Sequence, residues 1–128
     1  MIKEMKGWKV LSGRRWSARV CTTVYYPIGK EIRPNIKGSK LFFFKKYEDA
    51  DRFCLLKGER IVSCVARNVT KPKYILNDLF YIDHFWQWKN EHPNRSIKEY
   101  RPTYPTYFPI VTTAPKGTYW AESIICLK

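Results

Sequence analysis

The segment 95–107 combines arginine, lysine and tyrosine at a spacing suited to binding a nucleic acid. In polyproline II geometry, which repeats about every three residues, Arg101, Tyr104 and Tyr107 would lie on one side. Proteins that bind single strands use basic groups for the phosphates and aromatic rings as platforms for the bases. The alternative is a loop whose tyrosines pack down on the domain, and the sequence leaves both open. The candidate residues of this segment are Arg95, Lys98, Tyr100, Arg101, Tyr104 and Tyr107.

A second basic segment, 30–46, could cradle phosphates. Lys45 and Lys46 come directly before the acidic start of a predicted helix, so part of their charge is neutralised locally. We expect the binding face to combine this segment with 95–107. The candidate residues of the second segment are Lys30, Arg33, Lys37, Lys40, Lys45 and Lys46.

The acidic residues cluster at the starts of predicted helices, where the helix dipole accounts for them. Glu122 is the exception, because it stands in the apolar run 118–127 after a Pro-Lys-Gly-Thr turn. The mono-ADP-ribosyltransferases use a lone glutamate late in a strand, and Arg19 or Tyr26 would then be its partners. Alternation along a single strand instead puts Glu122 on the same water-facing side as Trp120. A catalytic residue needs a partnered site, and none is visible here. Glu122 is therefore a weak catalytic candidate, and the sequence favours a protein without enzymatic activity while leaving the question open.

The histidines, His84 and His92, do not have the spacing of a metal pair. They are eight residues apart, which on a helix separates them by about 80°, whereas a metal pair on a helix is spaced four residues apart. We interpret each as a surface or capping residue. The chain has no GxSxG, P-loop, GxGxxG or HExxH motif and no Cys/His cluster with ligand spacing. We therefore predict neither a metal site nor a cofactor.

The chain of 128 residues carries a formal net charge of +13, and the charge is uneven. Residues 1–67 contain 16 Lys and Arg against 6 Asp and Glu, whereas residues 68–128 contain 8 against 5. Such a field concentrates polyanions near the protein. We therefore expect an anionic partner, with nucleic acid first and a phosphate-bearing nucleotide second. The alternative explanation of the charge is solubility.

The cysteines point to a reducing compartment. Each of the four lies in an apolar run, far from the others, so we interpret them as buried free thiols of a protein that acts inside a cell. The N-terminal sequence MIKEMKGWKV has no apolar core of a signal peptide, and no apolar run is long enough to span a membrane. We therefore expect an intracellular protein without a membrane partner. The cysteines are Cys21, Cys54, Cys64 and Cys126.

Periodicity and turn residues predict the elements that position these groups. Residues 27–40 should form a loop, and the four prolines of 100–115 exclude an ordinary central strand or helix there. The second helix should end at Pro93 and the first at Gly58, after an acidic first turn. Strands are predicted at 7–12, 16–26, 41–44, 60–67 and 118–127, the first two of them joined as a hairpin. Helices are predicted at 47–57 and 78–91.

Strands outnumber helices in this order and rarely alternate with them singly. The sequence therefore predicts an α+β domain with a mainly antiparallel sheet of about five strands, two helices and an extended Pro/Tyr-rich segment. The length fits one domain, 1–128.

Five motifs follow one another along the chain: KGWKVL (6–11), YPIGK (26–30), GSKLFFF (38–44), EDADRF (48–53) and PKGTYWAE (115–122). In this order they resemble a pattern in small uncharacterised proteins of phages and large DNA viruses. The resemblance covers about residues 6–70 and 112–128, and about 74–111 looks like an insertion that many relatives lack. It implies a virus or phage product that acts inside a host cell, and it carries over no functional residue.

The first hypothesis is a non-enzymatic domain that binds an anionic partner through a basic, aromatic surface. The runner-up is a protein that inhibits a host factor through protein–protein contacts of 79–107, because exposed aromatic residues bring large contact area at low entropic cost. An ADP-ribosyltransferase-like enzyme that depends on Glu122 is third. Salt separates the first two, because phosphate contacts weaken steeply as salt rises.

Overall fold

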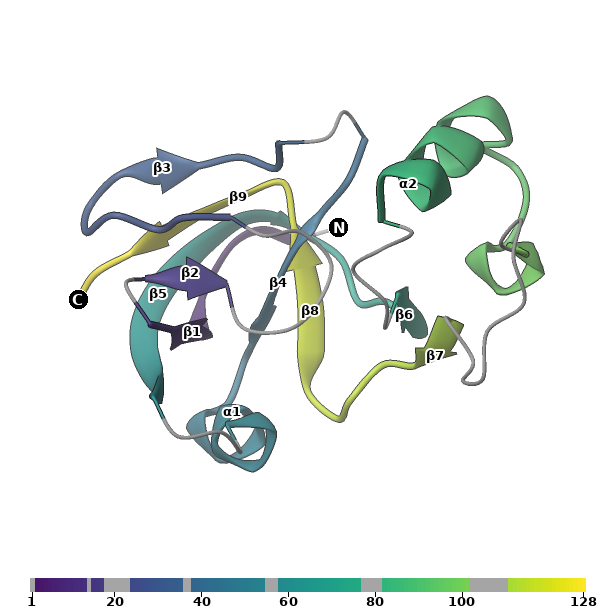
Figure 1. Cartoon of the computed structure of the whole chain (residues 1–128). Helices are drawn as coiled ribbons and strands as arrows, with labels where there is room; N and C mark the ends of the chain where they lie inside the picture. The colour runs from purple at the N-terminus through teal and green to yellow at the C-terminus, as the bar shows by residue number, and fades with distance from the viewer. Residues whose placement is uncertain are drawn as a thin grey trace.

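The computed structural model describes residues 2–13, 15–17, 24–35, 38–54, 58–76, 82–101 and 111–128. Within these residues an antiparallel sheet is accompanied by two α-helices and a separate two-stranded sheet (Figure 1). The predicted α+β class and the mainly antiparallel sheet are confirmed, with slightly more strands than expected.

The main sheet is built on two long strands, β1 (Ile2–Ser12) and β5 (Glu59–Val69), which pair antiparallel from end to end. The sequence predicted both strands, but it started the first one five residues too late, at residue 7, and placed the second at 60–67, slightly shorter than observed. The order across the sheet is β3-β9-β5-β1-β4-β8, and β2 pairs with β1 off this path. The other strands are β2 (Trp16–Ser17), β3 (Glu31–Ile32), β4 (Leu41–Phe44), β8 (Thr118–Ala121) and β9 (Ser123–Cys126).

The single strand predicted at 118–127 is wrong, because the chain forms two strands that change partners at Glu122. β8 pairs with β4, whereas β9 pairs with β5 and β3. β8 also contacts the chain just after the C-terminal end of β5. There Trp120 and Thr70 exchange backbone hydrogen bonds of 2.7 and 2.8 Å. The sheet therefore curls into a barrel-like shape. Alternation does not run through Glu122, and Thr118 is buried rather than facing water.

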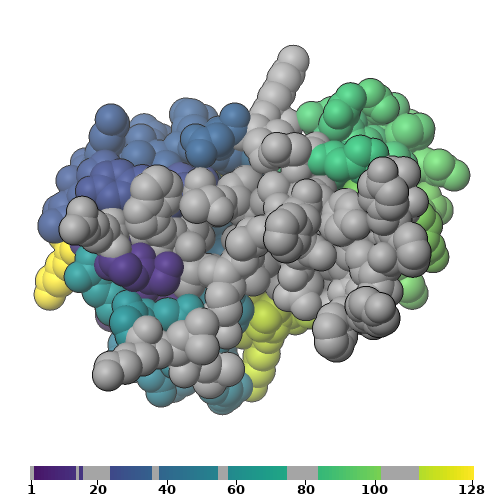
Figure 2. All heavy atoms as spheres, in the orientation of Figure 1, coloured from purple at the N-terminus to yellow at the C-terminus, as the bar shows by residue number. Residues whose placement is uncertain are grey.

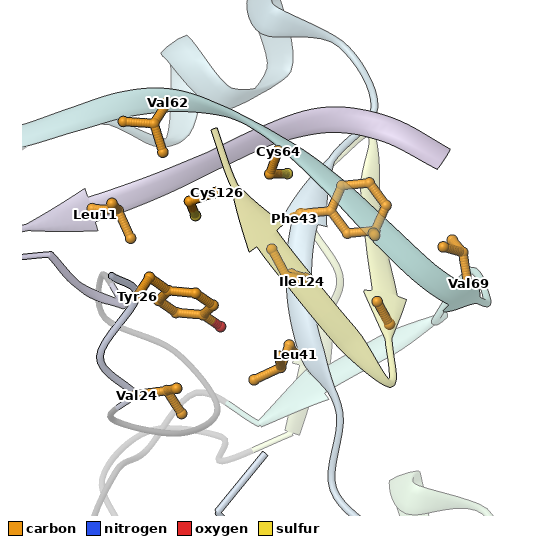
Figure 3. Packing of buried hydrophobic residues seen from close by; sticks show 12 residues of the cluster. Leu11, Val24, Tyr26, Leu41, Phe43, Val62, Cys64, Val69, Ile124 and Cys126 are labelled. Carbon is orange, nitrogen blue, oxygen red and sulfur yellow. The ribbon is translucent and has the colours of Figure 1, made fainter. Parts of the chain in front are cut away.

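Side chains on the inside of this curved sheet form the main core (Figure 3). Leu11 of β1, Phe43 of β4 and Ile124 of β9 are fully buried there, together with Tyr26, which precedes β3. The apolar run Leu41–Phe44 is covered on both faces, and all four of its residues are buried. Alternate residues of β4 enter the inner core and a second core on the outer face.

The helix α1 (Tyr47–Phe53) covers the second core on the outer face. Its Ala50 is buried with Phe42 and Phe44 of β4, and Phe53 packs against both rings. The helix begins where predicted, with Glu48 in an acidic first turn, and its described part ends earlier than residue 57.

The second sheet pairs β6 (Tyr74–Leu76) with β7 (Val111–Thr113). Between them in sequence come α2 (Ile82–Glu91) and a short 3₁₀ helix (Ile97–Glu99). The residues of α2 form a lobe beside the barrel in the space-filling view (Figure 2). The lobe joins the barrel where Trp86 of α2 lies 6.1 Å, centroid to centroid, from Trp120 of β8. That 74–111 is an insertion relative to other proteins stays a prediction.

Two further expectations need adjustment. The segment 27–40 is not only a loop, because it contains β3. The predicted hairpin of 7–12 and 16–26 is confirmed by the pairing of Leu11 with Ser17, and residues 18–23 lie outside the described part of the chain. None of the helices in the described ranges is both long and apolar enough to cross a membrane.

Candidate functional site

The predicted basic segment 30–46 is divided by β4. Lys40 lies just before the strand and Lys45 just after it, so roughly 16 Å of extended chain, at about 3.3 Å per residue, separates the two. Lys30 precedes β3, and Lys46 is the N-cap residue of α1. The structure therefore places these residues at separate points on the surface, and Lys37 lies outside the described residues.

Arg33 belongs to an ion-pair network around Glu31. The Ser123 hydroxyl donates to the Glu31 carboxylate at 2.8 Å, and guanidinium nitrogens of Arg67 and Arg33 lie 3.5 and 3.7 Å from it. The Ser123 hydrogen bond, followed by the two arginines, holds the pKa of Glu31 below its usual value. The charge of Arg33 is thus partly neutralised by Glu31.

Lys40 forms an ion pair of 3.3 Å with Glu122 at the β8/β9 bend. The Asn68 side-chain amide donates to the other oxygen of the same carboxylate at 2.9 Å. The Asn68 hydrogen bond and then Lys40 lower the pKa of Glu122, which therefore stays ionised. These contacts give Glu122 a structural role at the bend. The partners suggested from the sequence do not join it, because Tyr26 lies in the inner core and Arg19 lies outside the described residues.

The described part of 95–107 does not present a line of stacking platforms. Tyr100 is buried, and its hydroxyl lies 2.7 Å from Nδ1 of His84. Arg101 donates to the backbone oxygens of Lys98 and Tyr100, and Arg95 pairs with a glutamate four residues later. Tyr100 therefore packs down on the domain, which was the alternative to an exposed stacking platform. Tyr104 and Tyr107 lie outside the described residues.

A hollow of about 320 Å³ opens across four neighbouring strands of the main sheet. It crosses β9, β5, β1 and β4 in the order in which they lie in the sheet. Its lining residues are Leu127, which follows β9, Ser63 and Cys64 of β5, Lys6, Gly7 and Trp8 of β1, and Lys45, which follows β4.

Strand periodicity positions the main side chains of the hollow. Lys6 and Trp8 are two residues apart on β1, so they point to the same face of the sheet. This is the outer face, because Trp8 packs against the second core. Gly7 between them lies so close to β4 that an added Cβ would come 2.5 Å from the Phe44 backbone oxygen. A residue without a side chain at this point lets β1 and β4 approach each other beneath the hollow.

The hollow is basic and aromatic. Both of its lysines, Lys6 and Lys45, are exposed, and no acidic residue is among its described lining residues. Tyr47 of α1 meets the half-buried Trp8 edge to face at 5.2 Å and is itself 48% exposed. An aromatic ring flanked by ammonium groups can hold a planar base by stacking and a phosphate by charge.

Sequence reasoning found one of the three residues that give the hollow its character. Lys45 was a candidate, whereas Trp8 was interpreted only as part of the strand 7–12 and Lys6 was named only in the motif KGWKVL (6–11). The Lys-x-Trp spacing in a strand was a usable signal, because it puts a cation and a ring on one face. The register that brings Lys45 to them was not visible in the sequence.

The histidines are explained by local packing. Nδ1 of His92 lies 2.9 Å from the Trp88 backbone oxygen, and the Trp88 and His92 ring centroids are 5.5 Å apart with the rings tilted by 30°. In the described segments no three His, Cys, Asp or Glu side chains come together as a metal site. Cys64 and Cys126 are buried free thiols, as predicted, whereas Cys54 is only half-buried and Cys21 lies outside the described residues.

Comparisons of the chain with protein-family models, with curated proteins and with solved structures find no match. The resemblance to phage and large DNA virus proteins therefore stays a prediction.

Proposed function

We propose that the protein binds single-stranded nucleic acid, with one base stacked on Trp8 and phosphates held by Lys6 and Lys45. The observation that carries this proposal is the composition of the hollow, where a half-buried indole and two exposed lysines line the same space and none of the described lining residues is acidic. The net charge of +13 supports it, because it draws polyanions to the whole surface.

The size of the hollow favours one nucleotide unit. Clefts for small ligands measure about 300–1,000 Å³, and this one, at about 320 Å³, is at the lower end. A duplex keeps its bases stacked inside the helix and can offer none to Trp8 without unstacking energy of a few kcal/mol. We therefore propose a single strand, or a free nucleotide of the same chemistry, in preference to a duplex.

The alternative is a protein partner, a host factor inhibited through 79–107. Aromatic protein contacts are less sensitive to salt than phosphate contacts, so the salt dependence of binding distinguishes the two. The setting we propose for either activity is the interior of a host cell infected by a virus or phage, as the sequence resemblance implies.

The test is fluorescence anisotropy of a labelled single-stranded oligonucleotide, titrated with the whole protein at several salt concentrations. The variant Lys6→Ala/Lys45→Ala should bind about tenfold more weakly at physiological salt. Its plot of log affinity against log salt should be shallower by about 1.4, since each lost single-strand phosphate contact removes about 0.7. A duplex of the same length should bind more weakly than the single strand at physiological salt.

The matched control is Lys98→Ala/Arg101→Ala, which removes the same charge from the 3₁₀ helix (Ile97–Glu99) and the residues directly after it. It should keep the affinity within about twofold and leave the salt slope unchanged, because a distant charge adds only a screened, long-range attraction. A larger loss in the control than in the hollow variant would move the site to 95–107. Equal losses would mean that charge alone binds, and no binding at physiological salt would favour the protein partner.

A further inference from the structure

Cys64 of β5 and Cys126 of β9 are directly opposite each other in the main sheet. Opposite residues in an antiparallel pair are either hydrogen-bonded to each other or not, and the neighbouring pair shows which kind the cysteines are. The Leu127 N–H donates to the Ser63 carbonyl at 2.9 Å. Leu127 and Ser63 are therefore a hydrogen-bonded pair, and pairs alternate along an antiparallel ladder. The two cysteines thus form a non-hydrogen-bonded pair, the kind in which opposite side chains are closest.

This geometry is that of a disulfide. Opposite residues in a non-hydrogen-bonded pair have Cα atoms about 4.5 Å apart, within the range of about 4.4–6.8 Å that disulfides require. Both side chains enter the inner core, where they are 1% and 0% exposed. Figure 3 shows them on adjacent strands, pointing into the same core.

We propose that Cys64 and Cys126 are a redox pair that closes to an intrachain disulfide when the protein meets hydrogen peroxide. One thiolate attacks the peroxide O–O bond, becomes a sulfenic acid and releases the other oxygen as water. The second thiol then attacks that sulfur, and a second water leaves as the S–S bond forms. The two thiols lose two electrons and two protons, and the peroxide takes them up. This inference is independent of the proposed function.

The surroundings make the pair slow to react rather than unreactive. Burial raises the pKa of Cys64 to about 12 and also raises that of Cys126, so few thiolates exist at neutral pH. The positive charge of Lys9 lowers the pKa of both thiols and so opposes part of this increase. In the folded protein the pair therefore remains reduced, and oxidation requires transient opening of β9 from β5. Once formed, the bond joins two strands that are already neighbours, so it needs little rearrangement.

The experiment treats the whole native protein with hydrogen peroxide, blocks the remaining thiols with N-ethylmaleimide and analyses peptides without reduction. We expect a linked species that is two hydrogen atoms lighter than the separate Cys64 and Cys126 peptides and that dithiothreitol reverses. The variant Cys126→Ser should lose this species, whereas Cys54→Ser should keep it. The oxidised protein should melt on the order of 10 °C higher, because the bond closes a long loop of the unfolded chain.

A second variant guards against a Cys126→Ser protein that does not fold. Cys21→Ser/Cys54→Ser leaves only the proposed pair and should still form the reversible link with the same rise in melting temperature. Links to Cys21 or Cys54, dimers between chains, sulfinic acid without a link, or no oxidation at all would each overturn the proposal.

Discussion

The side chain of Lys9 ends inside the barrel, where it is fully buried. Its Nζ donates to the Phe42 backbone oxygen at 2.6 Å and lies 3.7 Å from the centroid of the Phe42 ring. A buried ammonium is costly unless it is hydrogen-bonded and paired, and the carbonyl and the ring supply that compensation here. These contacts also join β1 to β4 at a point where few register pairs link the two strands.

Lys9→Met should lower the free energy of unfolding by about 1–3 kcal/mol. Methionine keeps the length and apolar volume of the lysine stem, but it leaves the Phe42 carbonyl buried without this donor. Urea unfolding of the variant measures the loss, with Lys3→Met on the exposed part of β1 as the control, for which about 0.5 kcal/mol or less is expected. Equal or higher stability for Lys9→Met would mean that desolvating the ammonium costs as much as its contacts return.

Single residues also show how far the sequence could predict the site. Lys45 was recognised because it belongs to an evident basic run, but the partners of Lys40 and Arg33 were not. Lys40 is engaged by Glu122, a carboxylate distant in sequence, whereas Glu31 lies two residues from Arg33 and is also held by Arg67 and Ser123, which are distant in sequence. The local sequence pattern shows where the charged residues are, but it does not show which residues, brought close by the fold, neutralise them.

At the scale of elements, Gly7 determines how closely β1 and β4 approach. A Cβ at this position would come 2.5 Å from the Phe44 backbone oxygen and 2.6 Å from the Phe43 ring. The backbone oxygen cannot move without shifting β4, so the contact cannot be relieved by a side-chain rotation. The floor of the hollow therefore depends on this glycine.

Gly7→Ala should destabilise the protein by about 1–3 kcal/mol, the usual cost of overpacking a core, and weaken oligonucleotide binding as the strands separate. Thermal or urea unfolding measures the first effect, and anisotropy the second. Lys6→Ala, one residue away and pointing outward, is the control and should unfold within about 0.5 kcal/mol of the parent protein. A Gly7→Ala protein of unchanged stability would show that β1 and β4 have room to separate freely.

The elements that the sequence predicted are those with a strong local pattern. The apolar run Leu41–Phe44, the acidic-start helix at Tyr47 and the alternating strand β5 all carry such patterns. The break between β8 and β9 has no such local pattern, because the chain bends at Glu122 only in response to a change of strand partner, from β4 for β8 to β5 and β3 for β9. β6 was missed for a similar reason, since its partner β7 lies far along the chain.

At the scale of the whole molecule, the carboxylates at the bends act as counter-charges within a strongly basic protein. Glu31 connects β3 with β5 and β9, and Glu122 connects the loop before β4 with the β8/β9 bend. Both have a lowered pKa in the folded protein. With a net charge of +13, loss of either negative charge also increases the repulsion among the remaining cations.

These lowered pKa values predict how stability depends on pH. A carboxyl whose pKa is lower in the folded than in the unfolded state, where it is about 4.3, stabilises the fold above that unfolded value. The contribution disappears as pH falls through the folded pKa. The melting temperature should therefore drop below about pH 4–5. Glu31→Gln/Glu122→Gln should melt lower than the parent at pH 7, show a smaller drop in acid and approach the parent at about pH 3. Thermal unfolding followed by circular dichroism from neutral to acidic pH measures both curves, and parallel curves would mean that other groups control the acid response.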